Sequence, residues 1–80
     1  MAVSIMDNAV VDTFGQRIRL CRNVKSLSKS TCAGALGISV VYLNLLESGR
    51  RGVPSIKLVQ RMAAYLGVTT SQLLGETALR

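Results

Sequence analysis

Eighty residues, 49% of them hydrophobic, are enough for one small domain with a thin core. The chain carries a net charge of +6, no histidine and two cysteines, Cys21 and Cys32, which excludes a disulfide framework and the usual zinc sites. No apolar run approaches the ~20 residues that cross a bilayer, and Asp7 and Asp12 argue against a secretory leader. We therefore expect a cytoplasmic protein with reduced thiols, no cofactor and no membrane partner.

The positive charge is concentrated in the middle of the chain. Between Thr13 and Arg61 the only acid is Glu47. The cations of this stretch are Arg17, Arg19, Arg22, Lys25, Lys29, Arg50, Arg51, Lys57 and Arg61. A basic middle on a small domain is typical of a protein that binds a polyanion, with a merely solubilising surface as the alternative.

The first predicted helix covers residues 14–25. Thr13 and Gln16 have the spacing of a capping box, in which each side chain satisfies a free backbone N–H. Apolar residues then recur at helical spacing and predict a core-facing side. They are Phe14, Ile18, Cys21 and Val24. Residues 1–12 are predicted to be an arm that contacts a dimer partner or is disordered.

Two short helices are predicted next, over residues 29–36 and 40–47. Ser28 and Ser39 are suitable N-caps, and Gly37 fits the left-handed position that ends a helix. Only residues 37–39 separate the two helices. Two short helices joined by such a tight turn form a helix-turn-helix, which presents its second helix to the major groove of DNA.

Two more helices complete an all-α prediction. Pro54 and Ser55 introduce residues 56–66, and Gly67 ends them. Their predicted core face consists of Ile56, Val59, Met62, Ala63 and Leu66. A short last helix over residues 71–76 is capped by Thr69 or Thr70. We expect one domain over residues 13–75, followed by a short tail over residues 76–80.

Six ordered landmarks resemble a known family. They are FGQRIRLCR, the LS before the second helix, the ALGIS turn, VYL followed by LESGRR, PSIKLVQRMAAYLGV and SQLL. Over residues 14–74 the chain resembles the Cro and phage-repressor type of helix-turn-helix domain, the XRE family. This resemblance implies a compact five-helix bundle of the lambda-repressor type. It also implies sequence-specific control of transcription, usually as a homodimer on a palindromic operator in double-stranded DNA.

The resemblance implies three sets of phosphate contacts. Ser28 and Lys29 lie where the family grips phosphate with the start of the second helix, although Ser28 also has a simple capping role. The family usually has glutamine at position 29, and lysine keeps a phosphate contact without the amide. Tyr42 matches a common family residue that reaches phosphate. The loop after residue 47 offers phosphate its backbone N–H groups and side chains, with a solvated loop as the alternative. This loop consists of Ser48, Gly49, Arg50 and Arg51.

The positions of the family's base-reading side chains hold Val40, Val41, Asn44 and Leu45. Polar residues are usual there, because base edges are read by hydrogen bonds. Here only Asn44 can make a bidentate contact, for which adenine is the natural partner. The apolar residues have three possible roles: packing on thymine methyl groups, packing against the loop before residue 56, or binding a protein partner.

Arg22 and Glu47 match an arginine and an acid that pair in similar repressors. We therefore expect an ion pair between the first and third helices, with two independent surface charges as the alternative.

Cys21 and Cys32 are interpreted as small buried hydrophobes. A redox switch is conceivable only if their sulfurs are close.

Leu73 and Leu74 lie where similar repressors pair across a two-fold axis, although both could equally pack in the core of their own monomer.

The favoured function is a homodimeric DNA-binding repressor. The alternative is a protein-interaction module or antitoxin whose apolar third helix binds a protein partner. An enzyme is not expected, because the chain has no histidine and its four carboxylates are scattered.

Overall fold

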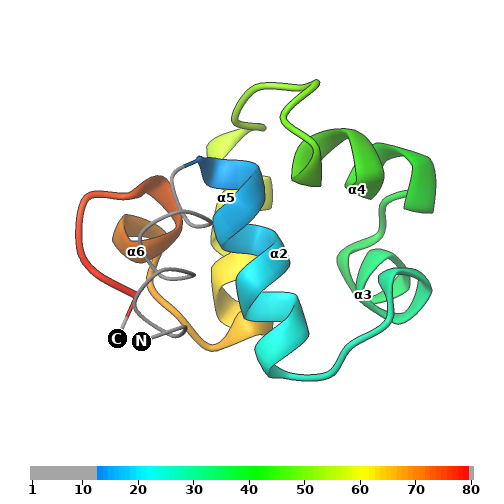
Figure 1. The fold of residues 1–80 in the computed structure, drawn as a ribbon, viewed down its shortest axis with the longest axis horizontal. Helices are drawn as coiled ribbons and strands as arrows, with labels where there is room; N and C mark the ends of the chain where they lie inside the picture. The colour runs from blue at the N-terminus through cyan, green and yellow to red at the C-terminus, as the bar shows by residue number, and fades with distance from the viewer. Residues whose placement is uncertain (1–12, 80) are drawn as a thin grey trace, which may run out of the picture.

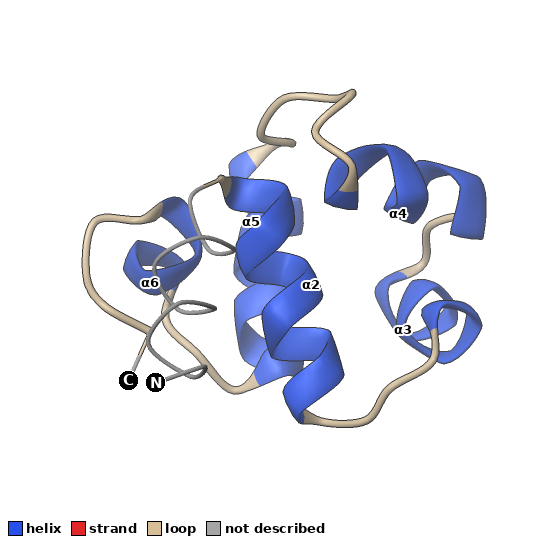
Figure 2. Cartoon of the chain, viewed as in Figure 1, coloured by secondary structure: helices blue, strands red, loops and turns tan. Residues whose placement is uncertain are grey.

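The computed structural model describes residues 13–79, and this part of the chain is all-α, as predicted (Figures 1 and 2). The predicted arm over residues 1–12 and the last residue of the predicted tail lie outside the described residues. Five helices and no strands are found between residues 13 and 79. They are α2 (Phe14–Val24), α3 (Lys29–Leu36), α4 (Val40–Glu47), α5 (Ile56–Leu66) and α6 (Thr70–Leu74).

Each helix begins where a hydroxyl side chain accepts a hydrogen bond from the backbone N–H three residues later. The capping residues are Thr13, Ser28, Ser39, Ser55 and Thr69. Capping boxes, with the reciprocal bond from the N-cap N–H to a glutamine, form at α2 and α6. The predicted starts of the first four helices are therefore confirmed. The last helix begins at Thr70, one residue earlier than predicted, and Thr69 is its cap.

Three of the five described helices, α3, α5 and α6, have a glycine in the left-handed conformation as their C-cap. Gly37 has φ 72° and closes α3 in the left-handed conformation, where its N–H and that of Ile38 bond back to α3 carbonyls. The last helix was predicted to reach residue 76, but it ends at Leu74. Gly75, with φ 84°, is its C-cap rather than part of the helix.

The five helices form a bundle with the helix-turn-helix unit on one side. Helices α3 and α4 lie on one side of the molecule and α6 on the other, with α2 and α5 between them (Figure 1). Helix α2 packs against α4 and α6, α3 against α4 and α5, and α5 against α6. Each helix supplies at least one fully buried side chain to the shared core. These side chains are Ile18, Cys32, Leu43, Leu46, Val59, Met62 and Leu73.

Two residues of the predicted core faces point to solvent, and one core residue was missed. Val24 is 75% exposed and Ile56 is 56% exposed. Both are terminal residues of their helices, and helical spacing alone predicted them wrongly. Leu58 is buried instead, and it lies on the same side of α5 as Met62, four residues later.

Candidate nucleic-acid interface

Helices α3 and α4 form the predicted helix-turn-helix unit. Their axes meet at 105°, within the range of about 90–120° that is usual for this motif. The N–H of Ile38 bonds to the carbonyl of Ala33, which holds the turn closed. Among the described residues no single helix is both long enough and apolar enough to cross a membrane. Helices α3 and α4 have that length and apolarity only when they are taken together, across this bend.

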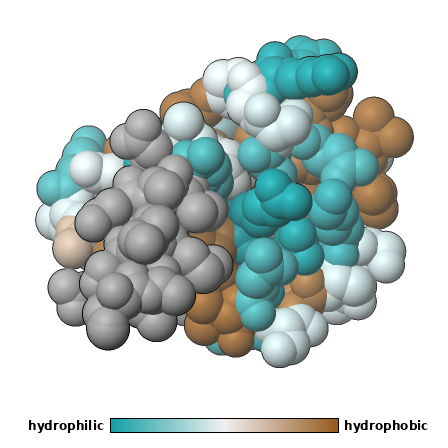
Figure 3. Space-filling view, in the orientation of Figure 1, coloured by the Kyte–Doolittle hydropathy of each residue, from teal (hydrophilic) through white to brown (hydrophobic). Residues whose placement is uncertain are grey.

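Helix α4 has a core side and an open side. Leu43 and Leu46 are buried beneath it. On the open side Val41 is 69% exposed, Val40 is 38% exposed and Asn44 is exposed, while Leu45 is half-buried. Hydrophobic surface is visible over this side of the molecule (Figure 3). The idea that these apolar residues pack against the following loop is therefore wrong for Val41.

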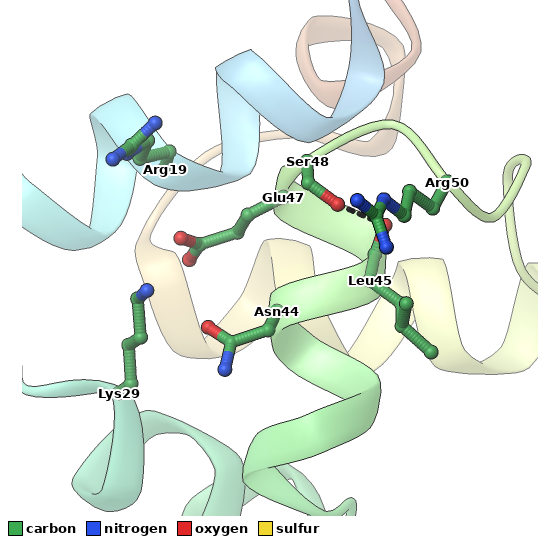
Figure 4. A pocket seen from close by; sticks show the side chains of 7 residues that line it. All are labelled: Arg19, Lys29, Asn44, Leu45, Glu47, Ser48 and Arg50. Atoms are coloured by element: carbon green, nitrogen blue, oxygen red, sulfur yellow. Dashed lines mark hydrogen bonds between the residues drawn. The ribbon is translucent and has the colours of Figure 1, made fainter.

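A hollow of about 340 Å³ lies between α2, α3 and the C-terminal half of α4 (Figure 4). It collects side chains that are far apart in the sequence. Its lining residues are Arg19 from α2, Lys29 from α3, Asn44, Leu45 and Glu47 from α4, and Ser48 and Arg50 from the next loop. Two predicted base readers, Asn44 and Leu45, thus share one hollow with three predicted phosphate contacts.

The loop after α4 has already used its backbone donors. The N–H groups of Arg50 and Arg51 both donate to the carbonyl of Leu45, at 3.0 and 3.3 Å. Those of Ser48 and Gly49 donate to other α4 carbonyls. This corrects the expectation that the loop offers backbone N–H groups to phosphate, because these donors complete the end of the helix. Gly49 has no side chain, so we no longer assign it a phosphate contact.

The side chains predicted to contact phosphate are accessible to different degrees. Arg50 and Arg51 are exposed, and Lys29 is half-buried at the hollow. The hydroxyl of Ser28 accepts the Thr31 N–H at 3.1 Å, so its capping role is present in the structure. Tyr42 is half-buried against the core, and that limits its reach toward a ligand.

Arg22 and Glu47 form a bidentate ion pair between α2 and α4. The Nε and Nη2 atoms of Arg22 lie 2.7 and 3.1 Å from the two carboxylate oxygens of Glu47. The two side chains are only 8% and 4% exposed, so the alternative of independent surface charges is wrong. Hydrogen bonding to Glu47 raises the pKa of Arg22. Nη1 of Arg22 also donates to the carbonyl of Leu27, 2.8 Å away, which ties the segment before α3 to the same pair.

Two other arginines bond to backbone carbonyls. Arg17 Nε donates to the carbonyl of Leu73 at 2.6 Å, and Arg61 Nη2 donates to that of Leu36 at 3.2 Å. Arg17 thus places its charge at the C-terminal end of α6, and Arg61 places its charge at the C-terminal end of α3. The helix dipole favours positive charge at such an end. No local sequence pattern could have identified these contacts, because the partners are 56 and 25 residues apart in the chain.

The family model for the helix-turn-helix domain matches residues 13–74. The chain belongs to the helix-turn-helix family. The resemblance to XRE-type domains drawn from the sequence is therefore confirmed.

Related helix-turn-helix proteins are transcriptional regulators rather than enzymes. The chain is 37% identical over 62 residues to the uncharacterized regulator YazB of Bacillus subtilis (strain 168), covering 78% of this chain and 88% of YazB. It is 41% identical over 59 residues to the regulator DdrOP3 of Deinococcus deserti, covering 74% of this chain but only 45% of DdrOP3. The chain thus spans less than half of that relative.

Solved structures of SinR show the same fold. SinR is an HTH-type transcriptional regulator of B. subtilis. Its structure in complex with DNA matches with a TM-score of 0.72 and 33% identity, covering 76% of this chain and 97% of the SinR chain. A complex of SinR with the SinI protein matches with a TM-score of 0.74 and 34% identity, covering 80% and 62% of the two chains.

Leu73 is not available as a dimer contact in this helix-turn-helix protein. It has no exposed surface and belongs to the core of its own chain, because α6 packs it against α2 and α5. Leu74 is half-buried and rests on the edge of the core. We therefore withdraw Leu73 from the predicted interface and retain Leu74.

Cys21 and Cys32 of the helix-turn-helix domain are buried free thiols. Burial raises the pKa of both thiols, and nearby Arg22 partly opposes this effect at Cys32. A thiol with a raised pKa is a poor nucleophile at neutral pH. Both residues therefore behave as the small core hydrophobes that the sequence predicted.

Proposed function

We propose that this protein is a sequence-specific DNA-binding transcriptional repressor that binds a palindromic operator as a homodimer. Helix α4 would lie in the major groove of double-stranded DNA. The observation that carries the proposal is the open side of α4, where Val40, Val41 and Asn44 are exposed and Asn44 lines a hollow together with Lys29 and Arg50. The DNA complex of SinR, which has the same fold, supports it.

The residue types of α4 favour contacts to A·T base pairs. The amide of Asn44 can bond to both N6 and N7 of adenine, and valine can pack on the thymine methyl group in the same groove. Leu45 would contribute from the edge of this surface. The side chains of Ser28, Lys29, Tyr42, Ser48, Arg50 and Arg51 would contact phosphates. Such contacts set the position of the protein on DNA without specifying sequence.

Selection of bound sequences from random duplexes tests the proposal. We expect an enriched palindrome that contains A·T pairs, with half-site centres about one helical turn apart, roughly 34–36 Å. Binding should weaken steeply with salt, because each neutralised phosphate releases counterions. If no sequence is enriched, the protein does not recognise DNA by sequence and the proposal fails.

The variant Asn44→Ala identifies the base reader. It should weaken binding to the selected sequence by roughly 1–3 kcal/mol and relax the preference at one base pair. Asn23→Ala is the matched control, because Asn23 is an exposed asparagine on α2 that does not line the hollow. Equal losses in the two variants would show that Asn44 does not read a base.

A protein-interaction module or antitoxin is the second candidate. Its support is the exposed apolar pair Val40 and Val41 at the start of α4, since clusters of exposed apolar side chains mark protein interfaces. SinR, a relative with the same fold, has been solved with a protein partner. Capture of a defined partner that persists in high salt, and is lost in Val41→Asp, would favour this function over DNA binding.

A further inference from the structure

We propose that Arg19 on α2 is a further contact to the DNA backbone. Together with Lys29 and Arg50 it would form a phosphate seat, a term used here for these three residues. The inference rests on the proposed DNA-binding function and deepens it by adding a residue that the recognition unit itself does not contain.

The three cations come from three separate elements and line one hollow. Arg19 extends from α2, Lys29 from the first turn of α3, and Arg50 from the loop after α4 (Figure 4). The volume of about 340 Å³ admits a phosphate group with some of its water. Three cations around one hollow attract an anion, because the low-dielectric protein wall focuses their field.

Glu47 also lines this hollow, but its charge is already compensated. Both carboxylate oxygens of Glu47 bond to the guanidinium of Arg22, at 2.7 and 3.1 Å. A free carboxylate would repel phosphate, whereas this one belongs to a buried, neutral pair. The uncompensated charge around the hollow is therefore that of the phosphate seat.

Arg19 differs from the other two arginines of α2. Arg17 bonds to the carbonyl of Leu73, and Arg22 is buried against Glu47. Arg19 is exposed and makes no hydrogen bond or ion pair with any residue from 13 to 79 in this structure. Its guanidinium remains free for a bidentate bond to phosphate, for which the planar fork of arginine is well suited.

The phosphate seat also adjoins the base reader. Asn44 lines the same hollow, so a phosphate bound there would hold the DNA backbone next to the Asn44 amide. Arg19 would thereby help to fix the register of α4 in the groove while reading no base itself. Loss of Arg19 should weaken binding to all sequences alike.

The salt dependence of DNA binding tests the role of Arg19. For Arg19→Gln we expect the slope of log K against log salt to become shallower by about 0.9, the value of one phosphate contact. The base preferences found by selection should not change. Arg19→Lys should retain most of the wild-type slope, because lysine keeps the charge.

Lys25→Gln is the matched control, because it removes one exposed charge from near the end of α2 without touching the hollow. Wild-type slope in Lys25→Gln together with a shallower slope in Arg19→Gln supports the phosphate seat. If Arg19→Gln keeps the wild-type slope while Lys29→Gln and Arg50→Gln lose slope, the contact by Arg19 is refuted and DNA binding stands. If the wild-type protein binds DNA without salt dependence, the proposed function fails as well.

Discussion

Arg22 connects three parts of the molecule through one side chain. Its guanidinium bonds to both oxygens of Glu47 on α4 and to the carbonyl of Leu27 before α3. Because the pair is buried, removing one partner leaves the other charge without compensation in a medium that solvates it poorly. The same contacts hold the start of α3 and the end of α4, between which the hollow opens.

Loss of Glu47 should therefore destabilise the fold strongly. We expect Glu47→Ala to lower the free energy of unfolding by about 3–5 kcal/mol in urea denaturation. The control Glu76→Ala should change it little, since Glu76 is exposed. The exchange of both charges, Arg22→Glu with Glu47→Arg, should recover part of the loss of either single reversal. Purely additive losses would contradict an energetic coupling between the two residues.

The two buried thiols predict a pH dependence of stability. Their pKa values in the folded state are raised above the ordinary 9.0. Well below pH 9 the thiols are protonated in both the folded and the unfolded chain, so they add no pH dependence there. As the pH rises past 9, the unfolded chain releases these protons first and stability falls.

Urea denaturation at pH 8 and pH 10 measures this effect. The wild-type protein should lose more stability between the two pH values than the double variant Cys21→Ala, Cys32→Ala. Comparison of the two differences removes the contribution of lysine and tyrosine side chains, which both proteins share. Equal pH dependence in the two proteins would show that the thiols are not responsible.

The contact between α2 and α4 depends on the absence of one side chain. A Cβ atom on Gly15 would lie 2.8 Å from the backbone oxygen of Glu47, and nearer still to that of Leu46. Both are backbone atoms at the end of α4, which cannot rotate away as a side chain does. Gly15 thus lets α2 come close enough for Arg22 to reach Glu47.

Two glycine-to-alanine variants should have opposite effects. Gly34 lies in α3 with no neighbouring atom within 4 Å of a Cβ atom, so Gly34→Ala should stabilise the protein by up to about 1 kcal/mol through helix propensity. Gly15→Ala should destabilise it by about 1–3 kcal/mol, because the overlap outweighs that gain. Thermal or urea denaturation measures both, and stabilisation by Gly15→Ala would contradict the close packing of α2 on α4.

For the molecule as a whole, the proposed palindrome requires a second copy of the chain. A two-fold symmetric operator is matched by a two-fold symmetric dimer. The recognition side of α4 must stay free for DNA, so the dimer contact belongs elsewhere. Leu74 and Leu79, both half-buried at the edge of the core, are the apolar candidates near the C-terminal end of the described chain.

Sedimentation velocity over a range of concentrations measures this association. We expect dimers to form as concentration rises and Leu74→Asp to shift the equilibrium toward monomer. Val41→Asp, on the opposite side of the molecule from α6, should leave the equilibrium unchanged. A monomer at every concentration tested would count against the homodimer.

The helices and their order were predicted correctly because their signals are local. A cap joins residues three apart, and a glycine ends a helix through its own backbone conformation. Thr13 with Gln16, Ser39 and Gly37 can therefore be read without knowing what lies beside them. The all-α class and the helix-turn-helix unit follow from this information, and the positions of the cations made a polyanion partner the natural expectation.

Other features depend on residues that meet only in the folded chain. Arg17 reaches a carbonyl 56 residues away, and Gly15 is needed only because α4 ends against it. Helical spacing placed Val24 in the core, although this last residue of α2 is exposed in the folded chain. Leu73 was assigned to a surface that it does not reach. Each of these features depends on how the helices are placed relative to one another. The spacing of apolar residues along one helix does not specify that placement.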